Sequence, residues 1–417
     1  MATMRDSLDV NAGKNRIGSV LAWTGGVLLL VALFVFLIMR KNGLREAELL
    51  AEQENKPLPQ VSGEELFGIT SEEEDVPPSE EESVETMPEN TYALPDKDTV
   101  TFTFAGDVLL DENYAVMSTY RANGSVLEEC IDPQLLEIMQ GSDVFMINNE
   151  FTFTDRGTPL ANKAYTFRAD PQNVQILKDM GVDIVSLANN HVTDYGEVSL
   201  LDTMDTLNGA GIPYVGAGAN IEEASKVVFY ENEDMRIGIV AATEVERLAS
   251  PDTKGATENT PGTFRCFRND DLEEVIREAK KECDFLIVVV HWGTESTDEI
   301  DWSQPGQAED FTAAGADVII GAHPHVLQEI AYVNDVPVFY SLGNFWFNSK
   351  TGNSCLVTLE IGEEGLVSSQ FIPCRTEGSK TYLATEGEGE RILEYMRDLS
   401  HGVKIDENGY VIKEAEE

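Results

Sequence analysis

The sequence predicts an α/β protein built from layers of helices and strands, and three observations support this class. From Val100 onward, short apolar runs rich in β-branched residues alternate with segments of helical periodicity. Hydrophobic residues make up 42% of the 417 residues and charged residues 25%, as in globular proteins of one large or two ordinary domains. No repeat of 20 to 50 residues is present, so a solenoid is not expected.

The N-terminal segment is predicted to anchor the chain in a membrane. Val20 to Met39 contains no charged side chain, and twenty helical residues span about 30 Å, the thickness of the hydrocarbon core. We therefore expect a single-pass span within residues 17–39. A cleavable signal peptide is the alternative, but residues 40–42 do not form a small-residue cleavage site. Since only residues 1–16 precede the span, we expect them in the cytoplasm and the C-terminal domain outside the cell membrane.

Residues 40–98 are predicted to be an acidic, disordered linker. Glu46 to Asp98 carries seventeen acidic and two basic side chains and is rich in Glu, Pro and Ser. Such a composition cannot bury enough apolar surface to offset the entropy of ordering. A flexible chain of this length spans roughly 40 Å. A spacer is favoured over an acidic tract that binds a partner.

The next segment, residues 99–375, is predicted to be the main domain, followed by a C-terminal helix and tail at 376–417. Its expected strands are Val100–Ala105, Val144–Ile147, Ile184–Leu187, Lys226–Tyr230, Arg236–Ala241, Phe285–Val290, Val318–Ile320 and Val338–Ser341, with a closing pair at Cys355–Ile361 and Val367–Pro373. The expected helices are Pro171–Met180, Val198–Asn208, Asp270–Lys281, Gln307–Ala314 and Glu388–Leu399.

Charge and cysteine content exclude several function classes. The 75 acidic residues outnumber the 29 basic ones and give a formal charge of −46, of which residues 99–417 carry −35. A surface of this sign repels phosphate backbones, so nucleic-acid binding is not expected. The five cysteines are scattered without a Cys-x-x-Cys pair, which argues against a zinc ribbon or a dense disulfide framework. One disulfide remains possible, and the sequence does not identify its members.

Metal-ligand side chains follow five of the predicted strands. The segments are Gly106-Asp107-Val108, Asn148-Asn149-Glu150, Ala188-Asn189-Asn190-His191, His291-Trp292-Gly293 and Gly321-Ala322-His323-Pro324-His325. Four of the five histidines of the chain lie in them. Because open α/β sheets build their sites at the carboxyl ends of strands, we expect these side chains to converge on a metal site. Mixed imidazole, carboxylate and carboxamide donors suit Mn, Fe or Zn.

The segments that carry these side chains resemble the motifs of a known family. The runs Phe104-Ala105-Gly106-Asp107-Val108-Leu109, Asn148-Asn149-Glu150, Ser186-Leu187-Ala188-Asn189-Asn190-His191, His291-Trp292-Gly293, Gly321-Ala322-His323-Pro324-His325-Val326-Leu327-Gln328 and Ser341-Leu342-Gly343-Asn344-Phe345 resemble, in order, the motifs of the capsule-synthesis protein CapA family. That family is associated with poly-γ-glutamate production and belongs to the calcineurin-like metallophosphoesterases. The resemblance covers about residues 100 to 375.

The resemblance implies a β-sandwich of two sheets flanked by helices, with two divalent metals at one edge. Asp107 and His325 would hold one metal, and Asn190, His291 and His323 the other, with Glu150 bridging the two. His191 resembles the residue that protonates the leaving oxygen, and Asp194 is placed to orient it. Two metals about 4 Å apart would activate a water and clamp the reacting oxygens.

The sequence departs from the superfamily pattern at two positions. Leu109 stands where the first motif usually has a histidine ligand, so the alternatives for the first metal are that it is weakly held, that it is absent, or that water or another residue such as Asp111 completes its ligands. Glu150 stands where an aspartate is typical, which changes the reach of the bridging carboxylate.

Residues around the expected site have less specific signals. Asn344 and Trp292 are predicted to contact substrate, although a Gly-Asn turn accounts equally well for Asn344. Core packing is favoured over an aromatic wall for Trp292, Trp346 and Phe347. Glu295 and Asp298 are expected to be solvated loop carboxylates, and His401 is assigned no role.

Two hypotheses of function follow. The first is a membrane-anchored, metal-dependent hydrolase that acts outside the cell on a phosphoester or on the γ-amide of an anionic capsule polymer. The second is a non-catalytic, polymer-binding subunit that assists synthesis, export or anchoring of that polymer, in contact with synthase or export subunits. The −35 charge of the domain confines contact with a polyanion to a metal-bearing cleft.

Overall fold

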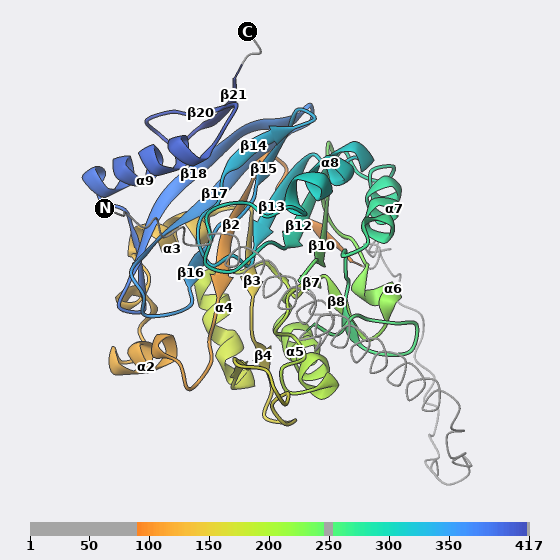
Figure 1. The fold of residues 1–417 in the computed structure, drawn as a ribbon, viewed down its shortest axis with the longest axis vertical. Helices are drawn as coiled ribbons and strands as arrows, with labels where there is room; N and C mark the ends of the chain where they lie inside the picture. Colours follow the sequence, from red (N-terminus) through yellow and green to blue (C-terminus); the bar gives the residue numbers. More distant parts are fainter. Residues whose placement is uncertain (1–89, 246–252, 415–417) are drawn as a thin grey trace, which may run out of the picture. The chain divides into compact units, whose positions relative to one another are not determined.

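Two β-sheets packed face to face, each with helices on its outer side, make up the fold (Figure 1). The computed structural model describes residues 90–245 and 253–414. The first sheet contains, in spatial order, β1 (Thr91–Ala93), β9 (Val228–Glu231), β10 (Arg236–Thr243), β12 (Phe285–His291), β13 (Val318–Ala322), β15 (Val336–Phe339) and β14 (Ile330–Val333). In this sheet β10, β12, β13 and β15 run parallel.

The second sheet combines an antiparallel and a parallel half. Its strands are, in spatial order, β19 (Lys380–Leu383), β18 (Gly365–Glu377), β17 (Gly352–Gly362), β2 (Thr99–Val108), β3 (Val144–Asn149), β6 (Ile184–Ser186) and β7 (Tyr214–Val215), with β16 (Asn344–Trp346) also paired to β2. The strands β2, β3, β6 and β7 run parallel, and β17 to β19 add antiparallel neighbours. The carboxyl ends of β2, β3 and β6 therefore share one edge.

Helices and short strand pairs complete the layers. The helices are α2 (Ala115–Ala122), α3 (Pro133–Gly141), α4 (Val174–Met180), α5 (Glu197–Ala210), α6 (Ile221–Ala224), α7 (Asn269–Ala279), α8 (Gln304–Ala314) and α9 (Glu386–Leu399), with 3-10 turns at Leu127–Glu129 and Pro171–Asn173. The short pairs are β4 (Thr152–Phe153) with β5 (Arg168–Ala169), β8 (Ala217–Gly218) with β11 (Gly262–Thr263), and β20 (Val403–Ile405) with β21 (Val411–Lys413).

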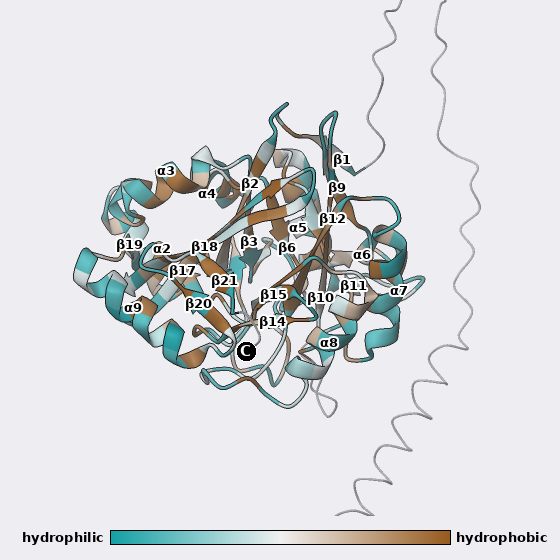
Figure 2. Cartoon of the chain, turned by 90° about the horizontal axis from the view of Figure 1, so that it is seen from above, coloured by the Kyte–Doolittle hydropathy of each residue, from teal (hydrophilic) through white to brown (hydrophobic). Residues whose placement is uncertain are grey.

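Side chains that alternate between the two faces of the strands pack into three apolar clusters. Phe102 and Phe104 of β2 pack between the sheets with Ile287 and Val289 of β12. Their neighbours on the other face pack under the outer helices, as Val288 does beside α7 and α8. Because both faces of the central strands are buried, their sequences read as continuous apolar runs. Figure 2 shows these hydrophobic strands between helices that carry more hydrophilic residues.

The structure confirms the predicted order of the main strands and helices. Each of the eight strands, the closing pair and the five helices predicted from sequence overlaps an observed element of the same type. The structure adds α2, α3 and α6, which the pattern did not predict, and several further strands of two to four residues. The two-sheet sandwich flanked by helices is thus present in the described residues.

Both ends of the predicted domain extend further than expected. The linker was predicted to reach Asp98, but residues 91–93 form β1 and pair in parallel with β9, and Leu94 is buried in the core between the sheets. This part of the linker prediction is wrong, because a short apolar β-prone segment follows the last acidic run. Strand β18 runs across the predicted boundary at 375, and α9 contributes Ile392 and Leu393 to the same core.

The predicted membrane span at residues 17–39 and most of the linker lie outside the described residues. Within residues 90–245 and 253–414, no helix combines the length and the apolar character needed to cross a bilayer.

Candidate metal centre and catalytic dyad

The predicted ligands meet where parallel strands of both sheets end. Asp107 lies near the end of β2 and faces Asn148 of β3 in the register, while His291 is the last residue of β12 and faces Ala322 of β13. Glu150 directly follows β3, and His323 directly follows β13. The shared direction of the strands thus brings together side chains that are far apart in sequence.

A close approach of two backbones shapes the edge next to Asp107. A Cβ atom on Gly106 would lie 1.8 Å from the carbonyl oxygen of Gly343, so only glycine fits there. The approach allows the amide of Asp107 to donate a 3.0 Å hydrogen bond to that carbonyl. The β2–β3 register also shifts between Phe104 and Asp107, which is the bulge geometry that re-aims side chains at sites.

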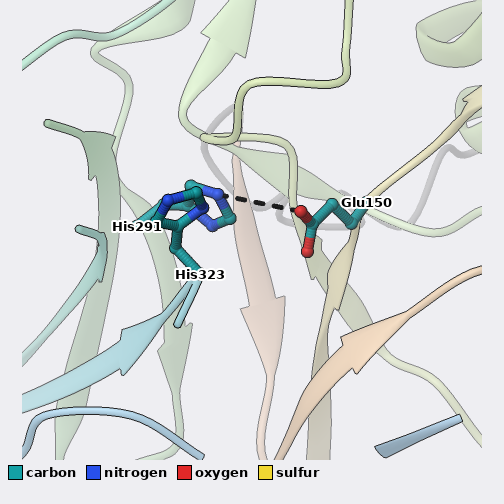
Figure 3. Close-up of side chains that lie close together, drawn as sticks. All are labelled: Glu150, His291 and His323. Atoms are coloured by element: carbon teal, nitrogen blue, oxygen red, sulfur yellow. Dashed lines mark ion pairs between the residues drawn. The ribbon is translucent and has the colours of Figure 1, made fainter. Parts of the chain in front are cut away.

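The buried acids and imidazoles form two groups with metal-binding geometry that share one carboxylate. Glu150, His291 and His323 make one group, and Asp107, Glu150 and His325 make the other. In each group the candidate ligand atoms lie within 4.8 Å of one another. Figure 3 shows Glu150 facing the two imidazoles of His291 and His323. The arrangement provides a cup that could hold two cations with Glu150 between them.

The oxygen Oε1 of Glu150 has the surroundings of a metal ligand. It is buried and has no hydrogen-bond partner among the described residues. The Nε2 atoms of His191, His291 and His325 lie 3.8, 3.9 and 3.8 Å from it. These distances are too long for hydrogen bonds but are less than twice the usual ligand–metal bond of about 2.0–2.2 Å. The side chains therefore fit a divalent cation placed between them.

Two asparagine amides fix the carboxylates from behind. Nδ2 of Asn148 donates to Oδ1 of Asp107 at 2.8 Å and to Oε2 of Glu150 at 3.1 Å. Asn189 in turn donates to Oδ1 of Asn148 at 3.1 Å. Ligand carboxylates held by a second layer of hydrogen bonds are typical of metal sites.

The side-chain oxygens of Asn190 and Asn344 each contact one histidine of the site. Oδ1 of Asn190 lies 3.0 Å from Nε2 of His291, and Oδ1 of Asn344 lies 3.0 Å from Nδ1 of His325. Nδ1 of His325 also lies 2.9 Å from Oδ2 of Asp107. Both amide oxygens therefore lie directly beside candidate metal-binding histidines.

Burial and mutual charge set the protonation of the cup. Burial and the neighbouring Asp107 carboxylate raise the pKa of Glu150 well above its usual range. Burial alone would raise the pKa of Asp107 too, but the hydrogen bond and charge of His325 outweigh burial and lower it. Burial, together with the charges of His323 and His325, lowers the pKa of His291 far below its ordinary value. A cation in the cup would favour the ionised carboxylates and neutral imidazoles that metal ligands need.

The turn after β13 is held in an uncommon conformation. His323 and His325 have φ angles of 101° and 61°, in the left-handed region that bulky residues seldom adopt. Such conformations cost free energy and persist where the surrounding structure enforces them, frequently at functional sites. The turn directs both imidazoles toward Glu150.

Beside the cup, His191 and Asp194 form a buried dyad. Nδ1 of His191 donates to Oδ2 of Asp194 at 2.7 Å, which leaves Nε2 toward Glu150. The ring of Phe167 packs over the imidazole with centroids 4.3 Å apart. Burial lowers the pKa of His191, and the charge of Asp194 opposes part of that shift.

A cavity of about 550 Å³ opens onto this dyad and onto the Asp107–His325 side of the cup. Asn190, His191, His325 and Asn344 are among its lining residues. The other lining residues include Tyr114, Lys163, Tyr165, Glu295, Phe347, Asn348, Lys350, Asn353 and Tyr395. The volume is in the range of small-molecule sites, so a substrate segment can reach the proposed metals.

Comparison with known proteins agrees with this geometry. Residues 101–349 match the family model described as bacterial capsule synthesis protein PGA_cap. The chain belongs to this family.

Two CapA proteins of Bacillus species are similar to this chain over more than half of its length. PGA biosynthesis protein CapA of Bacillus subtilis (strain 168) is 31% identical over 297 residues, 69% of this chain and 74% of that protein. Capsule biosynthesis protein CapA of Bacillus anthracis is 31% identical over 251 residues, 58% of this chain and 60% of that protein. The solved structure of the sulfate thiohydrolase SoxB of Thermus thermophilus with glycerol has a TM-score of 0.36 and 12% identity, covering 70% of this chain and 58% of that one. The family model and the two CapA relatives confirm the capsule-synthesis family predicted from the motifs.

The structure brings all eight predicted metal and dyad residues to one place. They are Asp107, Glu150, Asn190, His191, Asp194, His291, His323 and His325. Asn344 also lines the cavity, as predicted. Their roles in metal binding and proton transfer stay predictions, since grouping alone does not assign them.

The substrate contact predicted for Trp292 is wrong, while the core packing favoured for it is confirmed, and Asp111 drops out of the alternatives for the first metal. Trp292 does not reach the cavity: its side chain is 0% exposed, it stacks on Tyr340, and its indole N–H donates to the Tyr340 carbonyl at 2.8 Å. Asp111 does not complete the first ligand group, because its oxygens accept backbone hydrogen bonds from Asn113 and Arg168. Leu109, at the usual histidine position, is fully buried in the core.

Replacing Trp292 by Phe is expected to destabilise the protein while leaving KM for substrate unchanged. The substitution removes the buried hydrogen bond to Tyr340 and part of the packed indole volume, at a cost of about 1–3 kcal/mol. Urea unfolding measures the loss. A variant with wild-type stability and a raised KM would restore the substrate-contact assignment.

Sequence reasoning missed three residues of the site. Asn148 and Asn189 stand within the quoted motifs, so their position after a strand was a usable signal, but no role was assigned to them. Lys163 lies in a loop with no motif, and nothing in the sequence indicated it. Glu295, expected to be a solvated carboxylate, is exposed yet lines the cavity.

Proposed function

We propose that this chain is a membrane-anchored, metal-dependent hydrolase that acts in poly-γ-glutamate capsule biosynthesis outside the cell. Membership of the capsule synthesis family and the names of the Bacillus relatives support the biological role. The uncharged run from Val20 to Met39 supports the anchor. The observation that carries the hydrolytic activity is Oε1 of Glu150, which has no hydrogen-bond partner within residues 90–245 and 253–414 and faces three imidazole nitrogens at 3.8–3.9 Å.

The residues of the cup divide into two sets, one for each cation position. Asp107 and His325 would hold one, with Asn344 near it, and Asn190, His291 and His323 would hold the other, with Glu150 shared. Divalent ions bound there would supply an activated water at neutral pH and would neutralise charge that develops on the substrate.

His191 is the group of this chain that moves a proton. Its Nδ1 is held by Asp194, so Nε2 is the atom that faces both Glu150 and the cavity. In this position Nε2 gives its proton to the leaving oxygen or nitrogen. Burial lowers the pKa of the ring and so makes the imidazolium a stronger acid, while Asp194 preserves part of the protonated fraction.

The cavity lining fits an anionic substrate segment. Among its described lining residues, Lys350 and Glu295 are exposed and opposite in charge, and Lys163 is paired with Asp194, so the cavity lacks the strong negative charge of the domain as a whole. Amide and hydroxyl side chains such as Asn348, Asn353 and Thr376 offer hydrogen bonds to a polyamide or phosphoester. A γ-linked glutamate segment and a phosphoester both meet this description.

Removal and return of metal, combined with a His191 variant, tests the proposal. Full-length protein is treated with a chelator, reloaded with Mn or Zn, and assayed on model phosphodiesters and γ-linked glutamate oligomers. We expect turnover only with metal, and a fall of roughly 10²–10⁴-fold in kcat for His191→Gln with metal content unchanged. The matched control is His401→Gln, an exposed histidine outside the site, which should match wild type.

Two results would contradict the hydrolase. Turnover that survives chelation and the His191→Gln substitution would remove the site from the reaction. Metal-loaded protein that binds glutamate oligomers but hydrolyses neither substrate would instead support the non-catalytic, polymer-binding role.

A further inference from the structure

A buried lysine outside every motif connects the dyad to the loop between β4 and β5. The Lys163 side chain is only 7% exposed, and its Nζ donates to Oδ1 of Asp194 at 2.5 Å. The same ammonium donates to the backbone carbonyl of Asn190. Lys163 therefore contacts both ends of the segment 190–194, which carries the proposed proton donor.

The loop of Lys163 supplies most of the contacts that hold Asp194. The amide of Phe167 donates to Oδ2 of Asp194 at 2.7 Å, the oxygen that also accepts from His191. The amide of Leu160 donates to the Asp194 carbonyl at 2.8 Å. Both carboxylate oxygens of Asp194 are thus occupied, and Lys163 is the cation that balances its buried charge.

The balance matters because Asp194 is 0% exposed. A buried carboxylate without a positive partner is costly and tends to become protonated or to rotate away. Rotation would free Nδ1 of His191 from its acceptor, and protonation would weaken that acceptor, so the imidazole could turn and Nε2 would lose its direction toward the cavity.

From these contacts we infer that Lys163 is a positioning residue of the reaction: its ammonium holds the Asp194 carboxylate so that Nε2 of His191 faces the substrate. The catalytic part of this inference rests on the proposed function. Because Lys163 acts through Asp194, its loss should lower kcat and leave metal binding and KM unchanged.

The kinetic test combines three substitutions in full-length protein. Lys163→Met keeps the length of the side chain but removes its charge, and should lower kcat roughly 10- to 100-fold with metal content and KM unchanged. Lys163→Arg should recover part of the loss. In an Asp194→Asn background, Lys163→Met should cause little further loss, because the two residues act as one unit. The control is Lys178→Met, on the exposed side of α4.

A spectroscopic measurement tests the same inference without turnover. In zinc-loaded protein labelled with ¹⁵N-histidine, the Nδ1–H signal of His191, assigned with His191→Gln, should shift or disappear in Lys163→Met and stay in Lys178→Met. If no substrate is ever turned over, the proposed function fails and this spectrum alone decides the inference.

Several outcomes would overturn the positioning role. They are an unchanged His191 signal in Lys163→Met, a raised KM with unchanged kcat, or losses that add in the double variant. If Lys163→Met alone does not fold, the double variant with Asp194→Asn, which leaves no unpaired buried charge, is compared with Asp194→Asn instead. An equal His191 signal in those two proteins supports the inference, and an unequal one contradicts it.

Discussion

Replacing Glu150 by Gln is expected to remove most of the bound metal and to lower kcat/KM by on the order of 10³-fold. Glu150 is the one residue shared by both ligand groups, so its loss weakens both cation positions together. A neutral amide keeps the size of the side chain but gives up the negative charge that two cations need between them. Metal analysis of the purified protein and steady-state kinetics measure the two effects.

Glu364→Gln is the matched control for this experiment, because Glu364 is an exposed carboxylate in the turn between β17 and β18. It should retain wild-type metal content and activity. Glu150→Gln protein that still binds two metals and turns over substrate at the wild-type rate would show that the cup is not the reaction centre.

In metal-free protein, the same substitution should stabilise the fold. Burial and Asp107 raise the pKa of Glu150, so the folded state loses stability as the pH rises from the ordinary carboxyl range through that raised pKa. A glutamine cannot ionise, so the Glu150→Gln protein does not lose stability as the pH rises through this range. Thermal unfolding of chelated protein at neutral pH should therefore give Glu150→Gln the higher Tm, and wild-type protein the higher Tm after metal is added.

The strands and the ligands were predictable because one physical rule links them. Both faces of the central strands are buried, which gives continuous apolar runs such as 285–290, and polar residues can only follow where a run ends. His291 and His323 stand at such ends. The parallel direction of the strands then requires their ends to meet at one edge.

The contacts that cross between loops were not predictable. Lys163 reaches Asp194 from 31 residues away, through a loop whose sequence has neither periodicity nor motif. The placement of Trp292 was only partly predictable: core packing was favoured over an aromatic wall, but a tryptophan after a site histidine has the same sequence signal whether it faces the core or a cavity. Such placements depend on how the two sheets pack, which a single sequence pattern does not encode.

The short first strand, β1, was also not predictable from the sequence. Composition predicted disorder up to Asp98, yet Thr91 to Ala93 add an edge strand to the first sheet through backbone hydrogen bonds that need little from the side chains. Three residues are too few to show the alternation of apolar and polar residues that marks a strand. Pairing with β9 is what orders this segment.

Replacing Gly106 by Ala is expected to destabilise the protein by roughly 3 kcal/mol or more, or to prevent folding. The added Cβ would lie 1.8 Å from the Gly343 carbonyl oxygen, and that oxygen belongs to backbone that cannot rotate away. Relief requires the chain before β16 to move outward from β2, which breaks the hydrogen bond from the Asp107 amide. Because Asn344 follows Gly343 and contacts His325, the same movement would open one side of the metal cup.

The control for this change is Gly209→Ala in α5, where an added Cβ meets no atom within 4 Å and should stabilise the helix by up to about 1 kcal/mol. Urea unfolding compares the two variants, and metal analysis of any folded Gly106→Ala protein should show reduced binding. Wild-type stability of Gly106→Ala would mean that β2 and the Gly343 turn are not in contact, and the proposed geometry around Asp107 would fail with it. The glycine at this point therefore couples the packing of the sheet to the binding of the first cation.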